Sequence, residues 1–226
     1  ERARRVGDIE LVAIADTCEA RRAAALREVP GVRVYDSHQA LLDGEAGRLD
    51  FLDVCTPPCD HATIASAGLS AGLHVLCEKP LTASLESARD LAAQALRARR
   101  VLFPCHNYRH APVVRAIREV VGSGVIGDVT AVTLSTFRTS HAKGVAEWRP
   151  DWRRDRRTAG GGIAMDHGSH SLYLMFEWLG GHPTSVSART WNLRADKWDT
   201  EDAIGAWLAF PAGAAQVHLT WTAGVR

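Results

Sequence analysis

The sequence lacks the features that mark a membrane protein or a nucleic-acid-binding protein. Its 226 residues contain no apolar stretch near the roughly 18–20 residues that cross a bilayer. Lys and Arg number 27 and Asp and Glu number 26, so the net charge of +1 suggests neither nucleic acid nor an anionic lipid surface as a partner. We therefore expect no nucleic acid and no membrane among its partners.

The five cysteines lack the spacing of a disulfide framework or of a metal site, since none forms a CxxC pair. Cys55, Cys77 and Cys105 each end a short apolar run, where a free thiol behaves as a small buried hydrophobe. The first residues also lack the basic, apolar and small-residue order of a signal peptide. We therefore expect reduced cysteines and a cytoplasmic location.

The first half of the chain alternates short apolar runs with helical segments. Strands are expected at 10–15, 32–35, 51–55, 74–77 and 101–104, and helices at 18–29, 37–43, 61–71 and 85–98. Strands separated by helices of this length are joined by right-handed crossovers, and near-continuous apolar strands fit a sheet covered on both faces. We predict an α/β dinucleotide-binding domain over residues 1–122, with a doubly wound Rossmann-type parallel sheet.

The pattern changes after a helix expected at 112–121. A strand at 129–137, an irregular stretch rich in Trp and Arg, and a helix at 165–179 precede strands at 184–193, 203–210 and 216–221. Pro211 to Ala214 is a good hairpin connection. These features predict an α+β substrate and oligomerisation domain over residues 123–226, with an open, mainly antiparallel sheet.

The sequence has no glycine-rich phosphate loop ahead of Asp16, which ends the apolar run ELVAIA. An acid at this place in a dinucleotide-binding unit accepts hydrogen bonds from ribose hydroxyls, and the loop lies about 20 residues upstream. We therefore expect the first strand and its loop to precede residue 1. A carboxylate would repel a 2′-phosphate and so favours NAD, while Arg21 and Arg22 leave NADP open. An ordinary helix cap is the alternative for Asp16.

Two further motifs follow predicted strands. Thr56-Pro57-Pro58, with His61 shortly after, follows one strand, and Glu78-Lys79-Pro80 follows the next. Ligands of doubly wound sheets bind outside the carboxyl ends of the strands, so both motifs are expected at the same crevice. The alternative for Lys79 is a solvated side chain on a surface turn.

Together these residues resemble the Gfo/Idh/MocA family, which includes glucose-fructose oxidoreductase and inositol dehydrogenase. The pieces run from residue 11 to residue 170 in the family's order and spacing: LVAIAD, DVCTPPCDH, GLHVLCEKPL, HNYRHAP, GVIGDV and GGGIAMDHGSH. The resemblance implies an NAD(P)-dependent oxidoreductase that moves a hydride between nicotinamide and a carbinol of a sugar or polyol. It also implies a chain clipped at both ends.

The resemblance also implies roles for individual residues. Lys79, Asp166 and His170 match the family's active-site lysine, the acid of its glycine motif and its proton-transferring histidine. Asp16 matches the ribose-binding acid. The positions that line the nicotinamide side are matched by Thr56, Pro57, His61, Glu78 and Lys79.

These residue types suit the oxidation of a carbinol. A histidine has the pKa range to exchange a proton near neutrality, and a lysine can stabilise a developing alkoxide. Asp166 lies four residues before His170, so on a helix it would share a face with the imidazole and orient it. Gly160 to Gly162 would let the backbone turn tightly into that helix.

Several assignments keep alternatives. Trp152, Arg153, Tyr108 and Arg109 are candidates to contact a sugar, or they pack between the domains. Asp166, His167 and His170 could instead bind zinc, but no further His/Cys cluster supports a metal. Other functions open to the same fold are an NAD-recycling glycosidase and a non-catalytic regulator that senses a dinucleotide or sugar. The sheet of the second domain could support a homo-oligomer.

Overall fold

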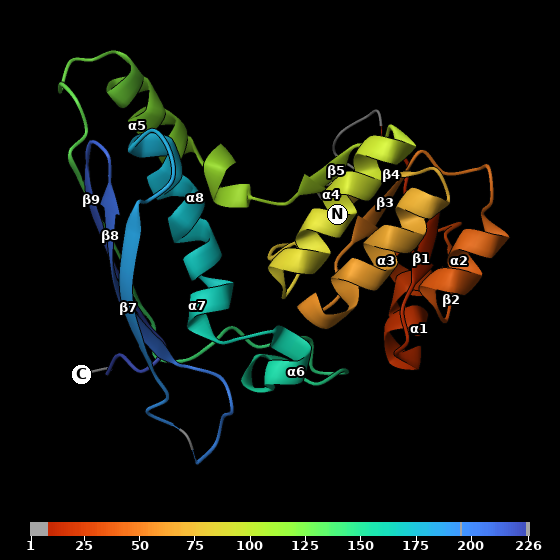
Figure 1. Cartoon of the computed structure of the whole chain (residues 1–226). Coiled ribbons are helices and arrows are strands. Elements are labelled where there is room, and N and C mark those ends of the chain that lie inside the picture. The colour runs from red at the N-terminus through yellow and green to blue at the C-terminus, as the bar shows by residue number, and fades with distance from the viewer. Residues whose placement is uncertain (1–8, 195, 225–226) are drawn as a thin grey trace.

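Two halves of different construction lie side by side in the computed structural model, which describes residues 9–194 and 196–224 (Figure 1). The N-terminal half holds short parallel strands and their connecting helices. The C-terminal half holds a four-stranded sheet with one long helix packed along it. Within the described residues, no helix has the length and apolar character needed to span a membrane.

All strands of the N-terminal half pair in parallel. The strands are β1 (Ala13–Ala15), β2 (Arg33–Tyr35), β3 (Phe51–Val54), β4 (His74–Cys77) and β5 (Leu102–Pro104). The helices are α1 (Glu19–Glu28), α2 (His38–Gly44), α3 (Pro58–Ser70) and α4 (Leu85–Ala98). β1 pairs with β2, and β3, β4 and β5 form a second sheet in that order. This alternation confirms the predicted Rossmann-like fold.

Local chemistry explains where these helices begin. The hydroxyl of Ser37 accepts the backbone N–H of Ala40 at the start of α2, and Ser84 accepts that of Ser87 at the start of α4. Pro58 occupies the first turn of α3, where its missing N–H costs no hydrogen bond. These starts place the loops that follow β3 and β4 at one edge of the sheet.

Helices α3 and α4 cover one face of the β3–β4–β5 sheet (Figure 1). Their residues Leu69 and Leu91 pack against Val54 and Val75, and all four are almost fully buried. On the opposite face, Phe51 and Phe103 are 40% and 45% exposed. The sequence predicted a sheet covered on both faces. Within the described residues, helices cover only one face of the β3–β4–β5 sheet.

The C-terminal half begins with short helices and ends with the mixed sheet. Its helical elements are η2 (Asn107–His110, a 3-10 helix), α5 (Pro112–Gly122), η3 (Trp152–Arg154, also 3-10), α6 (Arg156–Ala159), α7 (Ile163–Asp166) and α8 (Gly168–Trp178). Its strands are β6 (Ala131–Phe137), β7 (Ser185–Trp191), β8 (Ala203–Phe210) and β9 (Gly213–Thr220). The strand order is β6-β9-β8-β7.

Two of the three strand pairings in this sheet are antiparallel, as predicted, whereas β6 runs parallel to β9. The turn between Phe210 and Gly213 joins β8 to β9, which confirms the predicted hairpin. Helix α8 packs on one face, where Met175 meets Leu208 and Leu219 in a core that also buries Trp221. Side chains on the other face point away from this core because strand residues alternate.

The helix predicted over 165–179 is wrong in one respect, because it breaks at His167. In a continuous helix the carbonyl of Asp166 would accept the N–H of His170. That N–H bonds instead to the carbonyl of His167, at 3.1 Å. The freed carbonyl of Asp166 accepts from the ammonium of Lys79 at 2.8 Å. A contact from the other half of the molecule therefore accompanies the break.

Candidate active site

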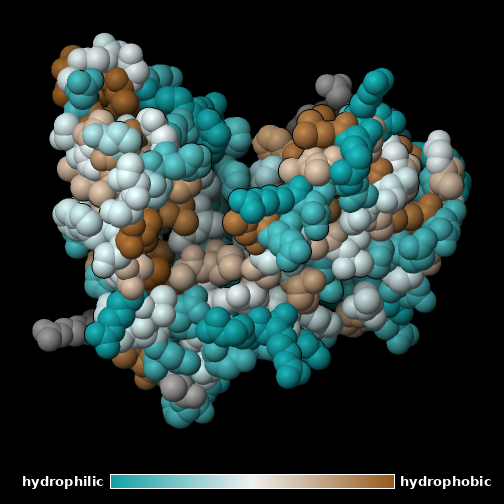
Figure 2. All heavy atoms as spheres, in the orientation of Figure 1, coloured by the Kyte–Doolittle hydropathy of each residue, from teal (hydrophilic) through white to brown (hydrophobic). Residues whose placement is uncertain are grey.

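A cleft lies where β3 and β4 end and where the turn ahead of α7 crosses from the other half. It has a volume of about 150 Å³. Its walls are formed by Cys55, Thr56, Pro58, Glu78, Lys79, Pro80, Trp152, Arg153, Ala159, Gly161, Met165 and Asp166. Figure 2 shows the surface hollowed between the two halves. The carboxyl ends of parallel strands are the usual ligand position in such sheets, and here they face residues of the second half.

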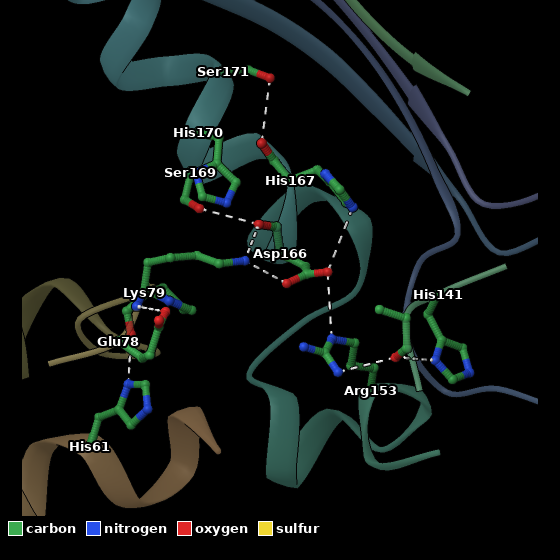
Figure 3. A network of polar contacts seen from close by, with 12 residues as sticks. His61, Glu78, Lys79, His141, Arg153, Asp166, His167, Ser169, His170 and Ser171 are labelled. Carbon is green, nitrogen blue, oxygen red and sulfur yellow. Dashed lines mark hydrogen bonds and ion pairs between the residues drawn. The ribbon is translucent and has the colours of Figure 1, made fainter. Parts of the chain in front are cut away.

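Lys79 and Asp166 form the ion pair that joins the two halves (Figure 3). The Nζ atom of Lys79 lies 2.7 Å from Oδ1 of Asp166 and 2.8 Å from its backbone oxygen. Both side chains are only 16% exposed. An ammonium has three N–H donors, so these two bonds leave one for a ligand in the cleft.

The carboxylate of Asp166 is held in its charged form by its neighbours. Burial raises the pKa of Asp166, but the charge and hydrogen bond of Lys79 and the charge of Arg153 outweigh it, and the pKa lies below its usual range. The Nε atom of Arg153 lies 3.5 Å from Oδ2, and Nε2 of His167 lies 3.8 Å from the same oxygen. The site therefore keeps a negative and a positive group side by side at neutral pH.

His170 lies next to this pair but makes its side-chain hydrogen bond elsewhere. Its Nδ1 atom is 2.8 Å from the hydroxyl of Tyr173, and its ring stacks on Tyr108 with centroids 4.0 Å apart. Burial and then the positive charge of Lys79 lower the pKa of His170 to about 4. The carboxylate of Asp166, predicted to orient this imidazole, instead contacts Lys79, Arg153 and His167.

We predict that the free energy of unfolding falls as the pH drops from about 6.5 to about 4. The pKa of His170 is about 4 in the fold against an ordinary 6.5, so in this window the unfolded chain binds a proton that the folded chain excludes. One such group changes the unfolding free energy by at most about 1.4 kcal/mol per pH unit. Burial also lowers the pKa of His106, His141 and His167, so these histidines change the free energy of unfolding in the same direction.

Urea denaturation between pH 7.5 and 4.5 measures this dependence. A His170→Gln variant removes one titrating group and should show a shallower fall than the parent protein. Equal slopes for the two proteins would mean that His170 is not the group that excludes the proton.

His61 lies in α3 with its side chain fully buried. Its Nδ1 atom is 2.8 Å from the carbonyl oxygen of Pro80, and its Nε2 atom is 2.7 Å from that of Thr56. The ring thus connects the loop after β3 with the loop after β4, which carries Lys79. Its predicted contact with a nicotinamide stays a prediction.

The residues predicted to contact a sugar lie in three different environments. Trp152 and Arg153 both line the cleft, and the guanidinium of Arg153 lies 4.1 Å from the Trp152 ring centroid. Tyr108 covers the imidazole of His170. Arg109 lies on the far side of η2, where its Nε atom is 3.3 Å from Glu177 of α8. The structure brings the first three to the cleft or to His170, and pairs Arg109 with α8.

Most of the residues predicted to hold a dinucleotide lie just after strand ends. Thr56 lines the cleft, and its buried hydroxyl makes no hydrogen bond within residues 9–194 and 196–224. Asp16 follows β1, and one of its carboxylate oxygens accepts the N–H of Cys18 at 2.8 Å. Pro57 caps α3, and Glu78 accepts the N–H of Lys79. A buried, unpartnered hydroxyl in the cleft fits a polar ligand there.

Sequence reasoning missed Glu201, which holds the turn of Gly160 to Gly162. Its carboxylate accepts the N–H of Gly162 at 2.7 Å, and its carbonyl accepts that of Ile163 at 3.0 Å. Gly162 thus approaches the backbone of Glu201 closely. No local signal connects residues 39 positions apart. Tyr173 was also missed, although its position three residues after His170 on a helix was such a signal.

No group of three or more His, Cys, Asp or Glu side chains in the described part of the chain could hold a metal ion. This statement includes Asp166, His167 and His170, the three residues considered above for zinc. The site within the described chain is therefore built from an ion pair, an imidazole and unpartnered polar groups.

Two family models match consecutive parts of the chain. An oxidoreductase family with an NAD-binding Rossmann fold matches residues 2–106, and the GFO/IDH/MocA C-terminal domain matches residues 114–226. Fold, cleft and models together define a class of nucleotide-binding oxidoreductases. The chain belongs to the Gfo/Idh/MocA family, which confirms the resemblance stated above. The predicted division of the domains at residue 122 stays a prediction.

Similar proteins of known activity act on sugars. The chain is 33% identical to the 1,5-anhydro-D-fructose reductase of Ensifer adhaerens, over 72% of this chain and 47% of that protein. It is 32% identical to the D-glucoside 3-dehydrogenase of Escherichia coli K12, over 73% and 45%. The crystal structure of GenD2 from gentamicin A biosynthesis, in complex with NAD, has a TM-score of 0.88 and 28% identity over 99% of this chain and 62% of that one. The chain spans about half the length of the curated relatives it matches.

Proposed function

We propose that the full-length protein is an NAD(P)-dependent oxidoreductase that interconverts a carbinol and a carbonyl in a sugar, cyclic polyol or related small molecule. The observation that carries this proposal is the Lys79–Asp166 ion pair, because it sets a charged donor in a cleft between the nucleotide-binding half and the second half. Two curated relatives are named as a sugar reductase and a glucoside dehydrogenase. We therefore assign the catalytic roles to Lys79, Asp166 and His170.

The chemistry divides between the cofactor and the side chains. A nicotinamide cofactor, when bound, would supply the hydride acceptor for the carbinol C–H bond. The remaining N–H of Lys79 donates to the substrate oxygen and stabilises the negative charge that develops on it. The neutral imidazole of His170 accepts the hydroxyl proton and passes it to solvent. In the reduction direction the same proton returns from His170 to the substrate oxygen.

Asp166 acts on the position of Lys79 in this scheme. It accepts two hydrogen bonds from the ammonium through its carboxylate and its backbone oxygen, and these bonds fix Nζ within the cleft. Because the charge of Asp166 is balanced by Lys79 and Arg153, the carboxylate does not compete for the substrate proton at neutral pH. The ring of Trp152 offers an apolar face to a polyol, and the guanidinium of Arg153 offers N–H donors to its hydroxyls.

The cofactor would be held by the strand ends of the first half. The second carboxylate oxygen of Asp16 would accept from the ribose, and the hydroxyl of Thr56 would bond to the nicotinamide end with Pro57, Glu78 and Lys79 beside it. A carboxylate disfavours a 2′-phosphate, so we propose NAD as the cofactor. Arg22 donates to the backbone oxygens of Asp16 and Thr17, and its nearby charge makes NADP the alternative.

The decisive experiment follows NADH or NADPH absorbance while the full-length protein is offered each cofactor with a panel of sugars and polyols. We expect turnover with NAD and at least one carbinol substrate. A glycosidase that recycles its cofactor would release an aglycone from a glycoside with no net NADH. A regulator would bind NAD or a sugar without turnover, and failure to bind either cofactor would reject both the oxidoreductase and the glycosidase.

We also propose that the second sheet forms a homo-oligomer through the face that α8 does not cover. Phe137 and Trp207 are 61% and 54% exposed and alternate with buried residues of β6 and β8. Large exposed aromatic residues on a sheet are typical of an interface. Sedimentation of the full-length protein and of a Trp207→Arg variant tests this proposal, since a monomeric parent protein would contradict it.

A further inference from the structure

We propose that Tyr173 is the positioning residue for His170, and that its hydroxyl decides which ring nitrogen exchanges the proton of the substrate. This inference rests on the proposed function for its chemistry. It starts from the hydrogen bond between Nδ1 of the imidazole and the Tyr173 hydroxyl, at 2.8 Å. With Nδ1 occupied in this way, Nε2 is the nitrogen left for the substrate.

Two rings hold the imidazole in this orientation. Tyr108 stacks on its face at an interplanar angle of 11°, and the Tyr173 ring meets its edge at 80° with centroids 5.8 Å apart. Tyr173 is itself packed against His106, with centroids 4.5 Å apart. His170 is 5% exposed, so rotation of its ring would require these neighbours to move.

A tyrosine hydroxyl suits this position because its oxygen can accept the Nδ1–H of the imidazole. When Nδ1 carries a proton, the phenol oxygen accepts it, and the bare Nε2 takes the proton of the substrate hydroxyl. The ring is then an imidazolium whose Nδ1–H still bonds to the same oxygen. In the reduction direction this imidazolium returns its Nε2 proton to the carbonyl oxygen of the substrate, and the neutral ring keeps its Nδ1–H on the phenol oxygen. The contact therefore persists through each proton state that the reaction uses.

Other groups around His170 affect its charge and not its orientation. Burial raises the pKa of Tyr173, so the hydroxyl stays protonated at neutral pH. The titratable groups that act on the imidazole from its surroundings are Lys79 after β4, Asp166 of α7, His167, His106 after β5 and the Tyr173 of its own helix. Lys79 and the two histidines disfavour the imidazolium, and Asp166 favours it.

The test compares Tyr173→Phe with Tyr35→Phe in the full-length protein. Tyr35 also loses one hydroxyl hydrogen bond, at 2.7 Å to Glu45, but it lies in β2 and away from His170. We expect Tyr173→Phe to lower kcat by about 10-fold to 100-fold, the size of effect known for outer-shell partners of metal-bound histidines. Tyr35→Phe should leave kcat unchanged, and KM for NAD should stay constant in both variants.

A second readout does not depend on turnover. In protein labelled with ¹⁵N-histidine, the signals assigned to His170 by their loss in His170→Gln should show one dominant tautomer, and Tyr173→Phe should show a mixture. The acid limb of the pH profile of kcat should shift in Tyr173→Phe only. Unchanged kcat, pH profile and ¹⁵N shifts in Tyr173→Phe would overturn the inference. A parent protein that turns over no substrate would instead reject the proposed function, while the tautomer measurement would still test Tyr173.

Discussion

Lys79→Met is expected to lower kcat by about 10²- to 10³-fold, the usual effect of removing a donor that stabilises a developing oxyanion. The substitution preserves most of the apolar stem and removes the ammonium that bonds to Asp166 at 2.7 Å. Because the charge and the hydrogen bond of that ammonium lower the pKa of the Asp166 carboxyl against the effect of burial, its loss should raise that pKa. Steady-state assays of the full-length protein with the best substrate of the panel measure the change in kcat.

Two comparisons separate chemistry from structural damage in this variant. Lys143 is exposed and lies outside the cleft, so Lys143→Met should leave kcat unchanged. A Lys79→Met/Asp166→Asn double variant also removes the charge of the carboxylate that has lost its ammonium partner, and should be more stable than Lys79→Met without recovering turnover. If Lys79→Met keeps kcat within about threefold of the parent protein, the donor role assigned from oxyanion stabilisation is wrong.

The parallel half of the fold could be predicted because its information is local. Short apolar runs such as that ending at Val54 lie between helices of regular length, and capping serines such as Ser37 mark the helix starts. Strand pairing between β6 and β9 carries no such signal. These strands are separated by α8, β7 and β8 in the chain, and only the assembled sheet makes them neighbours.

The irregular stretch between β6 and α6 could not be predicted for the same reason. Its buried His141 packs against Trp198 and Trp221, with ring centroids 5.2 and 5.9 Å apart. Arg154 places its guanidinium over Trp198, 5.1 Å from the centroid. A loop organised by contacts that distant in sequence has no periodicity of its own. It nevertheless ends in η3, which brings Trp152 and Arg153 to the cleft.

The site shows how a family pattern and physical reasoning complement each other. The family pattern identified both Lys79 and Asp166 as site residues, although 87 positions separate them in the sequence. The structure places their charged atoms in contact. Helical spacing, by contrast, suggested that Asp166 orients His170. That argument assumed an unbroken helix, and Lys79 bonds to the carbonyl that such a helix would use at this point. The i, i+3 spacing within α8 identifies Tyr173 as the partner instead.

Gly162→Ala is expected to be the most destabilising single change in the site, costing roughly 3 kcal/mol, at the upper end of the effects of overpacking. A Cβ at this position would overlap the carbonyl oxygen of Glu201 and lie 2.7 Å from its carbonyl carbon. The neighbour is backbone of a segment next to β8, so it cannot rotate away as a side chain would. To remove this overlap, α7 would have to move. Because Asp166 is part of α7, the same movement would separate it from Lys79.

Gly122→Ala is the matched control, since its added Cβ meets nothing within 4 Å at the end of α5. It should be neutral or slightly stabilising, because alanine loses less backbone entropy than glycine on folding. Urea denaturation should therefore give a much lower midpoint for Gly162→Ala than for Gly122→Ala, with kcat reduced in the first variant only. Equal midpoints would show that the turn can move away from Glu201, and that the Lys79–Asp166 geometry does not depend on this close approach.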